Sequence, residues 1–141
     1  MSRPRNPELV EAILDAAEHQ VAQKGYSSVT MRGLARKVEV TPTTLYYYFS
    51  DKEALFEAVK FRILGSLDTH IRESIDPEAS PADRLFQLMV IFLRWMVREK
   101  HRTELVFESL PPKTELSEED FERYYRVQLY AKDLIRQGVE E

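Results

Sequence analysis

The sequence predicts an all-α fold of about seven helices. Apolar residues recur at steps of three and four along most of the chain, which is the spacing of one face of a helix. Capping residues followed by proline, or by glutamate three positions later, mark one helix start after another. We find no convincing β-hairpin, internal repeat or low-complexity tract.

Composition narrows the class of protein. With 141 residues, 43% of them hydrophobic, the chain can bury a substantial core in one or two small domains. It has no cysteine, which excludes disulfides, thiolate metal sites and a cysteine nucleophile. No apolar stretch is long enough to cross a bilayer, and MSRPRNPELVEA lacks the apolar core of a signal peptide. We therefore expect a cytoplasmic protein with no membrane partner and no cofactor.

The net charge of −4 conceals an asymmetry between the two parts of the chain. Residues 1–60 hold eight Lys and Arg against eight Asp and Glu, whereas residues 61–141 hold twelve against sixteen. A local basic surface matters more to a nucleic acid than the average charge. The candidates for such a surface are Arg3, Arg5, Arg32, Arg36, Lys37 and Lys52.

The first helix is predicted from Asn6 and Pro7 to about Lys24. Asn6 can cap free N–H groups, and proline suits the first helical position. Gly25 suits a left-handed residue just past the end. The apolar stripe consists of Val10, Ile13, Leu14, Ala17 and Val21.

Three further helix starts follow within 21 residues, which implies two very short helices. Thr30 precedes one apolar stripe, Thr41 with Pro42 repeats the signal, and Ser50 stands three residues before Glu53, as in a capping box. The third start opens a longer helix from Asp51 towards Glu73. By propensity TLYYYF at residues 44–49 favours a strand. The flanking helix starts, and the lack of a pairing strand, favour a helix instead.

The remaining helices follow from similar signals. Asp76–Pro77 ends the long helix, and Ser80–Pro81 begins the next one. Residues 85–97 are apolar almost all round, which predicts a helix that is central to its domain or buried in an interface. A short helical piece is expected over residues 103–110, before two prolines. A capping signal at residues 117–120 then opens a last helix that runs to Gly138.

The second short helix carries the candidate functional residues. At about 100° per residue, the sequence assigns Leu45 and Phe49 to the buried side, Tyr46 and Tyr48 to the flanks, and Thr43, Thr44 and Tyr47 to the outer side. Threonine and tyrosine can donate to phosphate, and threonine can contact base edges. A tyrosine run often only packs its rings against a neighbouring helix. Here it lies on the second of two short helices joined by a short turn, the recognition position of helix-turn-helix proteins.

These residues resemble a known family. The segment TMRGLARKVEVTPTTLYYYFSDKEALFEAV is similar to the N-terminal signature of the TetR family of transcriptional regulators, and the match extends over residues 9–60. Glu39 replaces the glycine common in the family's turn, and Thr43 replaces a small residue. Because glutamate is strained in a left-handed conformation, we expect a turn that avoids positive φ at Glu39.

The resemblance implies roles for matching positions. Base edges would be faced by Thr41, Pro42, Thr43, Thr44 and Tyr47, while phosphates would be held by Tyr46, Tyr48 and Lys52. Thr30 and Arg32 would meet the backbone of the duplex. Arg3 and Arg5 resemble an arm that reaches a minor groove or a phosphate, although a disordered tail is the simpler interpretation.

The resemblance divides the chain into a helix-turn-helix domain at residues 1–50, a linking helix at 51–74, and a helical regulatory domain at 75–141. It implies a homodimer that binds a double-stranded DNA operator and a small apolar or amphipathic effector that releases it. An apolar effector cavity is predicted from Phe61, Leu64, Met89, Phe92, Leu93, Met96, Phe107, Tyr124, Tyr125 and Gln128. Ordinary core packing is the competing interpretation for each of them.

Two alternatives remain. The family generally carries two further helices that build its dimer interface, so we expect a shortened regulatory domain. This leaves open a fragment or truncated product, a dimerisation module without operator binding, or a dimer formed through residues 85–97. An enzyme is the third class, with His19, His70, His101 and carboxylates as its candidate groups. Their spacing matches no catalytic or metal-binding pattern, so the sequence favours a protein that is not an enzyme.

Overall fold

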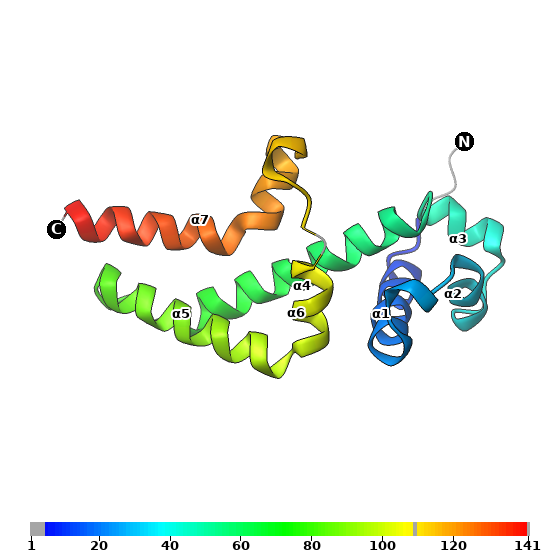
Figure 1. Cartoon of the computed structure of the whole chain (residues 1–141), viewed down its shortest axis with the longest axis horizontal. Helices are drawn as coiled ribbons and strands as arrows, with labels where there is room; N and C mark the ends of the chain where they lie inside the picture. Colours follow the sequence, from blue (N-terminus) through cyan, green and yellow to red (C-terminus); the bar gives the residue numbers. More distant parts are fainter. Residues whose placement is uncertain (1–4, 109, 141) are drawn as a thin grey trace. The chain divides into compact units, whose positions relative to one another are not determined.

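The computed structural model describes residues 5–108 and 110–140, and within them the fold is all-helical, as the sequence predicted. It has seven α-helices and two short 3₁₀ turns (Figure 1). The chain divides into two compact units, Met1–Lys60 and Phe61–Glu141, with the boundary inside the fourth helix. In the described part, no helix has both the length and the apolar character needed to cross a membrane.

The first unit is built from short helices that begin at the predicted caps. It contains α1 (Pro7–Lys24), a 3₁₀ turn (Tyr26–Ser28), α2 (Met31–Lys37), α3 (Pro42–Tyr48) and the start of α4 (Lys52–Ser74). The side chains of Asn6, Thr30 and Thr41 accept hydrogen bonds from backbone N–H groups two or three residues later, at 3.0–3.1 Å. Residues 44–48 are helical, so the flanking signals overrode strand propensity.

The start of α4 differs from the prediction. The proposed capping box between Ser50 and Glu53 is wrong, because Asp51 Oδ1 accepts the Ala54 N–H at 2.7 Å. The Asp51 backbone carbonyl also accepts the first helical hydrogen bond, from Leu55. A carboxylate at this position both caps the free amides and faces the positive end of the helix dipole. The helix therefore begins one residue later than the capping box predicted.

The turn between α2 and α3 also corrects the sequence analysis. Glu39 has φ of 58°, so the expectation that this turn avoids positive φ is wrong. The Glu39 N–H donates to the Arg36 carbonyl at 3.2 Å, and the Val40 N–H donates to the Ala35 carbonyl at 2.9 Å. This pair of bonds ends a helix only when the residue after its last turn is left-handed. The turn imposes the conformation although the residue is not glycine.

The buried side of α3 is formed by Leu45 and Tyr48, which are 0% and 7% exposed. The assignment of Phe49 to the buried side and Tyr48 to the flank is wrong. Phe49 has already left the helix, with φ of −136° and ψ of 120°, so helical angles no longer apply to it. The Tyr48 hydroxyl accepts the Asn6 N–H at 2.9 Å, and its carbonyl accepts Arg5 Nη2 at 3.2 Å. Tyr48 thus ties the end of α3 to the segment before α1.

The second unit contains the remainder of α4, then α5 (Pro81–Arg98), α6 (Lys100–Phe107), a 3₁₀ turn (Lys113–Glu115) and α7 (Glu118–Glu140). Within this unit α5 packs on both α6 and α7. The last helix passes through Gly138 instead of ending there, and it is kinked at Tyr125, which has φ of −111° and ψ of 18°. The buried side chains of this unit include Ile63, Leu67, Ile71, Leu88, Trp95, Val106, Val127 and Leu134.

The apolar helix α5 is less buried than its sequence predicted. Leu88 and Trp95 are buried, but an exposed stripe lies on the opposite side of the helix. This α5 stripe consists of Phe86, Met89, Leu93 and Val97, which are 69%, 52%, 57% and 83% exposed. A central position for α5 is therefore wrong for this chain, and the alternative of burial in an interface stays a prediction. Exposed apolar stripes of this kind often mark interaction surfaces.

Replacing Glu39 with glycine is expected to stabilise the protein. A side chain in the left-handed region costs about 1–2 kcal/mol, and the greater freedom of glycine in the unfolded chain offsets about 0.4–1 kcal/mol of that. We expect Glu39→Gly to raise the free energy of unfolding by about 0.5–1 kcal/mol, measured by urea denaturation. Glu39→Ala is the control, since it removes the charge but keeps the strained backbone. Equal stabilities of the two variants would contradict this account.

Removing the Tyr48 hydroxyl is expected to destabilise the first unit. Tyr48→Phe keeps the ring in the core but leaves the Asn6 N–H without its acceptor. We expect the free energy of unfolding to fall by about 0.5–1.5 kcal/mol. Tyr46→Phe is the matched control, because Tyr46 is 50% exposed and belongs to the same helix. A loss of stability that is the same in both variants would show that the hydrogen bond to Asn6 contributes nothing.

Candidate functional site

The outer face of α3 carries the exposed hydroxyl groups that the sequence assigned to DNA. Thr43 is exposed, and Tyr46 and Tyr47 are 50% and 41% exposed. Thr44 is half-buried, and its hydroxyl oxygen accepts a hydrogen bond from Thr41 Oγ1 at 3.0 Å. The face therefore combines two exposed phenol groups with threonines held close to the helix start.

Hydroxyl groups at the two helix starts are partly engaged within the protein. Thr30 Oγ1 accepts the Gly33 N–H at 3.0 Å, and Thr41 Oγ1 accepts the Thr44 N–H at 3.1 Å. Thr30, Arg32, Thr41 and Pro42 are all exposed. Because the Thr30 hydroxyl acts as an acceptor in its cap, its own proton remains available to a phosphate oxygen.

Tyr48 differs from its tyrosine neighbours. Its ring lies in the core, edge-on to Tyr47 with ring centroids 5.4 Å apart. Its hydroxyl oxygen accepts a hydrogen bond from Asn6 and keeps a proton to donate. Arg5 is held on the Tyr48 carbonyl, so it is not a free tail residue. Arg3, the other predicted arm residue, lies outside the described residues.

Lys52 has a partner that sequence reasoning missed. Its ammonium lies 4.0 Å from the centroid of the Tyr26 ring and donates a hydrogen bond to the Tyr26 carbonyl. Tyr26 in turn packs edge-to-face on Phe56, with centroids 5.0 Å apart. Burial, and then the charges of Glu53 and Asp51, raise the pKa of Tyr26 above its usual value of 10.0, so the phenol is neutral at physiological pH. The position of the Lys52 charge is therefore fixed from two sides.

The ten residues predicted to line an apolar cavity in the second unit differ in their burial and in their ring contacts. Phe61 packs on Tyr124 at 4.7 Å between ring centroids, while Phe92 packs on Phe107 at 6.1 Å. Tyr125 stacks on Phe121 at 4.9 Å. Leu64 is buried and Met96 is half-buried, whereas Met89, Leu93 and Gln128 are exposed. Most of this set belongs to separate aromatic pairs or to the α5 stripe.

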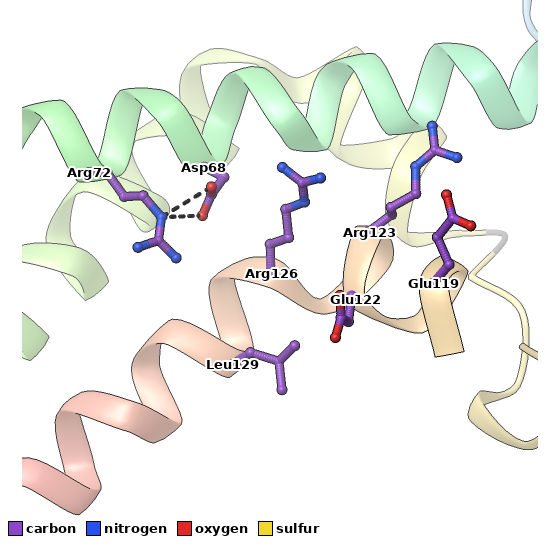
Figure 2. Close-up of a pocket in the computed structure, with 7 residues that line it drawn as sticks. All are labelled: Asp68, Arg72, Glu119, Glu122, Arg123, Arg126 and Leu129. Atoms are coloured by element: carbon purple, nitrogen blue, oxygen red, sulfur yellow. Dashed lines mark hydrogen bonds and ion pairs between the residues drawn. The ribbon is translucent and has the colours of Figure 1, made fainter. Parts of the chain in front are cut away.

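A cavity of about 470 Å³ in the second unit has a different lining (Figure 2). It lies between α4 and α7, and six of its seven lining residues are charged. The seven are Asp68, Arg72, Glu119, Glu122, Arg123, Arg126 and Leu129. Sequence reasoning missed this site because it searched the second unit for apolar side chains. The close spacing of charged residues along 119–126 was the available signal.

The histidines show no shared site. His19 lies on α1, His70 on α4 and His101 on α6, and all three are exposed. His101 Nδ1 lies 4.0 Å from Glu104 Oε2, at the limit of an ion pair. Among residues 5–108 and 110–140, no group of three histidine or carboxylate side chains is placed to hold a metal ion.

The comparisons with known proteins identify the first unit. Residues 13–59 match the family model described as bacterial regulatory proteins, tetR family. An uncharacterised HTH-type transcriptional regulator of Mycobacterium tuberculosis is 32% identical over 112 residues, which cover 79% of this chain and 55% of that protein. The regulator BetI of Rhizobium meliloti is 31% identical over 84 residues, 60% of this chain and 41% of BetI. The chain thus spans about half the length of these relatives.

Solved structures extend the likeness to nearly the whole chain. A TetR-family protein from Vibrio parahaemolyticus superposes with a TM-score of 0.69 at 25% identity, over 94% of this chain and 70% of that one. A structure from a Shewanella species has a TM-score of 0.74 at 21% identity and covers 96% and 71% of the two chains. The helix-turn-helix sequence and the all-α architecture agree with both comparisons. The chain belongs to the TetR family of bacterial regulatory proteins.

Proposed function

We propose that this chain is a sequence-specific DNA-binding transcriptional regulator, in which α3 enters the major groove. The observation that carries the proposal is the outer face of α3, where Thr43, Tyr46 and Tyr47 are exposed while Leu45 and Tyr48 anchor the opposite side. A helix fits the width of the major groove, and threonine and tyrosine can contact bases and phosphates there. Thr41, Pro42 and Thr44 complete the face towards the bases.

The phosphate contacts of the proposal surround this helix. Tyr46 and the remaining hydroxyl proton of Tyr48 reach one backbone, while Thr30 and Arg32 at the start of α2 reach another. Lys52 lies in the first turn of α4, where free amides and the helix dipole favour an anion. Because the Tyr26 ring and carbonyl already hold its ammonium, Lys52 loses little conformational freedom when it binds phosphate.

The regulatory part of the proposal is a repressor that leaves its operator when a small molecule binds. A small-molecule cavity in the second unit supports this, since α4 supplies residues to both units. Regulation of this kind needs two protein states that the effector and the DNA stabilise differently. A dimer is part of the proposal, because helix-turn-helix proteins read paired half-sites one helical turn apart.

Selection of bound sequences from a random DNA pool tests the proposal and separates the two kinds of contact. We expect a half-site-symmetric consensus. Tyr47→Ala is expected to relax that consensus, since it removes a contact to bases. Lys52→Gln is expected to weaken binding to all sequences alike and to lower the slope of log affinity against log salt by about 0.9, the value of one phosphate contact.

Lys24→Gln is the control for Lys52, because Lys24 is an exposed lysine at the end of α1 in the same unit. It is expected to leave affinity and salt slope nearly unchanged. Enrichment without any consensus would reject sequence-specific binding. It would favour a helical dimerisation or interaction module that lacks operator binding.

The α5 stripe is the surface that we propose for pairing of two copies. Phe86, Met89, Leu93 and Val97 recur at steps of three and four, which suits packing of one helix against another. We expect light scattering to show a dimer, and Leu93→Glu to weaken the dimer at least tenfold by placing a charge in the interface. Lys132→Glu, an exposed change on α7, is expected to leave it intact. A strictly monomeric parent chain would reject the role of the stripe.

A further inference from the structure

The charged cavity between α4 and α7 points to the chemical class of the effector. We propose that it binds a small organic monocarboxylate at the guanidinium group of Arg126, with Arg72 and Arg123 on either side of it. The inference deepens the proposed function, because it names the ligand of an effector-responsive regulator. This charged site shares no residue with the apolar cavity predicted from sequence.

Arg72 is held in place by Asp68 and Tyr130, and the N–H groups of its terminal nitrogens remain available as hydrogen-bond donors. Its Nε contacts both carboxylate oxygens of Asp68 at 3.1 Å, and its guanidinium lies 4.2 Å from the Tyr130 ring centroid. Asp68 is only 8% exposed, so this ion pair neutralises the one buried charge recorded for the described chain. Figure 2 shows the terminal nitrogens of Arg72 directed away from Asp68, towards α7. These nitrogens are the donors that a ligand carboxylate requires.

Arg123 is also positioned by an aromatic ring. Its guanidinium lies 3.7 Å from the Phe61 ring centroid, and Nη1 lies 4.0 Å from Asp120 Oδ1. The ring covers one face of the guanidinium but accepts no strong hydrogen bond from its N–H groups. The contact with Asp120 is at the distance limit of an ion pair. Arg123 therefore presents an oriented charge with donors left for a planar anion.

Arg126 is the group whose environment favours an added anion most clearly. In the described part of the chain its guanidinium has no hydrogen bond, ion pair or ring contact. In Figure 2 it extends from α7 towards α4, between Asp68 and Arg123, whereas Glu122 points away from α4. The cavity thus combines three guanidinium groups with the carboxylate of Asp68, which is paired with Arg72, and that of Glu119, which lies beside Arg123 in Figure 2.

Size and charge together select a monocarboxylate. The volume of about 470 Å³ lies in the range of small-molecule sites, about 300–1,000 Å³. Guanidinium groups bind carboxylates with two parallel hydrogen bonds. Glu119 and Glu122 also line the cavity and disfavour a dianion such as phosphate. Leu129 offers apolar contact to the body of the ligand.

The cavity also contains a feature that suits regulation. The kink at Tyr125 directly precedes Arg126 on α7, so a ligand held by Arg126 lies next to the kink. Asp68 and Arg72, which line the same cavity, belong to α4, the helix that begins at Lys52 in the first unit. Binding would therefore act on the one helix that belongs to both units.

The test measures binding to the full chain without DNA, by calorimetry and by the thermal unfolding midpoint at constant ionic strength. The probes are sodium acetate, butyrate and benzoate, with benzamide as the uncharged counterpart of benzoate and inorganic phosphate as the competing anion. We expect at least one carboxylate to bind and to raise the midpoint, and benzamide and phosphate to bind at least tenfold more weakly.

Arg126→Gln is expected to weaken that binding at least tenfold, whereas Arg136→Gln, an exposed arginine on the same helix, leaves it unchanged. The proposal is overturned if no carboxylate binds, if phosphate or benzamide binds equally well, or if both arginine variants behave alike. Since no DNA is present, a chain that fails to bind operator can still bind a carboxylate in this experiment. A chain that binds operator can equally fail to bind one.

Discussion

The burial of Leu45 and Tyr48 on one side of α3 determines what that helix presents to solvent. Seven residues are too few for a helix to be stable alone, so tertiary contacts must hold α3 in place. Leu45 supplies apolar burial, and Tyr48 adds hydrogen bonds to the segment that precedes α1. With these two side chains fixed, Thr43, Tyr46 and Tyr47 remain exposed, and Thr44 lies half-buried beside them. The proposed reading of DNA depends on this division of the helix into two sides.

Much of the first unit was predictable from sequence because its signals are local. The Asn6-Pro7 and Thr41-Pro42 pairs, the Thr30 cap and apolar spacing located α1 to α3 almost to the residue, and they overrode the strand propensity of the tyrosine run. Errors occurred where a residue at the end of an element departed from ideal helical geometry. Phe49 leaves the helix, Asp51 displaces Ser50 as the cap, and Glu39 adopts positive φ because the hydrogen bonds that end α2 demand it.

The candidate sites were less predictable because they depend on residues far apart in the chain. Tyr26 and Lys52 are separated by 26 positions, and only the fold brings the ring under the ammonium. In the second unit, hydrophobicity did not distinguish core residues from surface residues. Leu64 and Leu93 were therefore assigned to one cavity, although Leu64 is buried and Leu93 is exposed. The charged cavity arises from the packing of α4 beside α7, which no local pattern encodes.

The shared helix α4 has a consequence for how the protein unfolds. Its 23 residues contribute Leu55, Phe56 and Val59 to one hydrophobic core and Ile63, Leu67 and Ile71 to the other. Helix formation is cooperative, because each added turn builds on the hydrogen bonds of the turn before it. Loss of either core frees one end of α4 and thereby destabilises the part of α4 that packs in the other core. We therefore expect the unfolding of the two units to be coupled, with the middle of α4 as the point through which a local loss of order spreads.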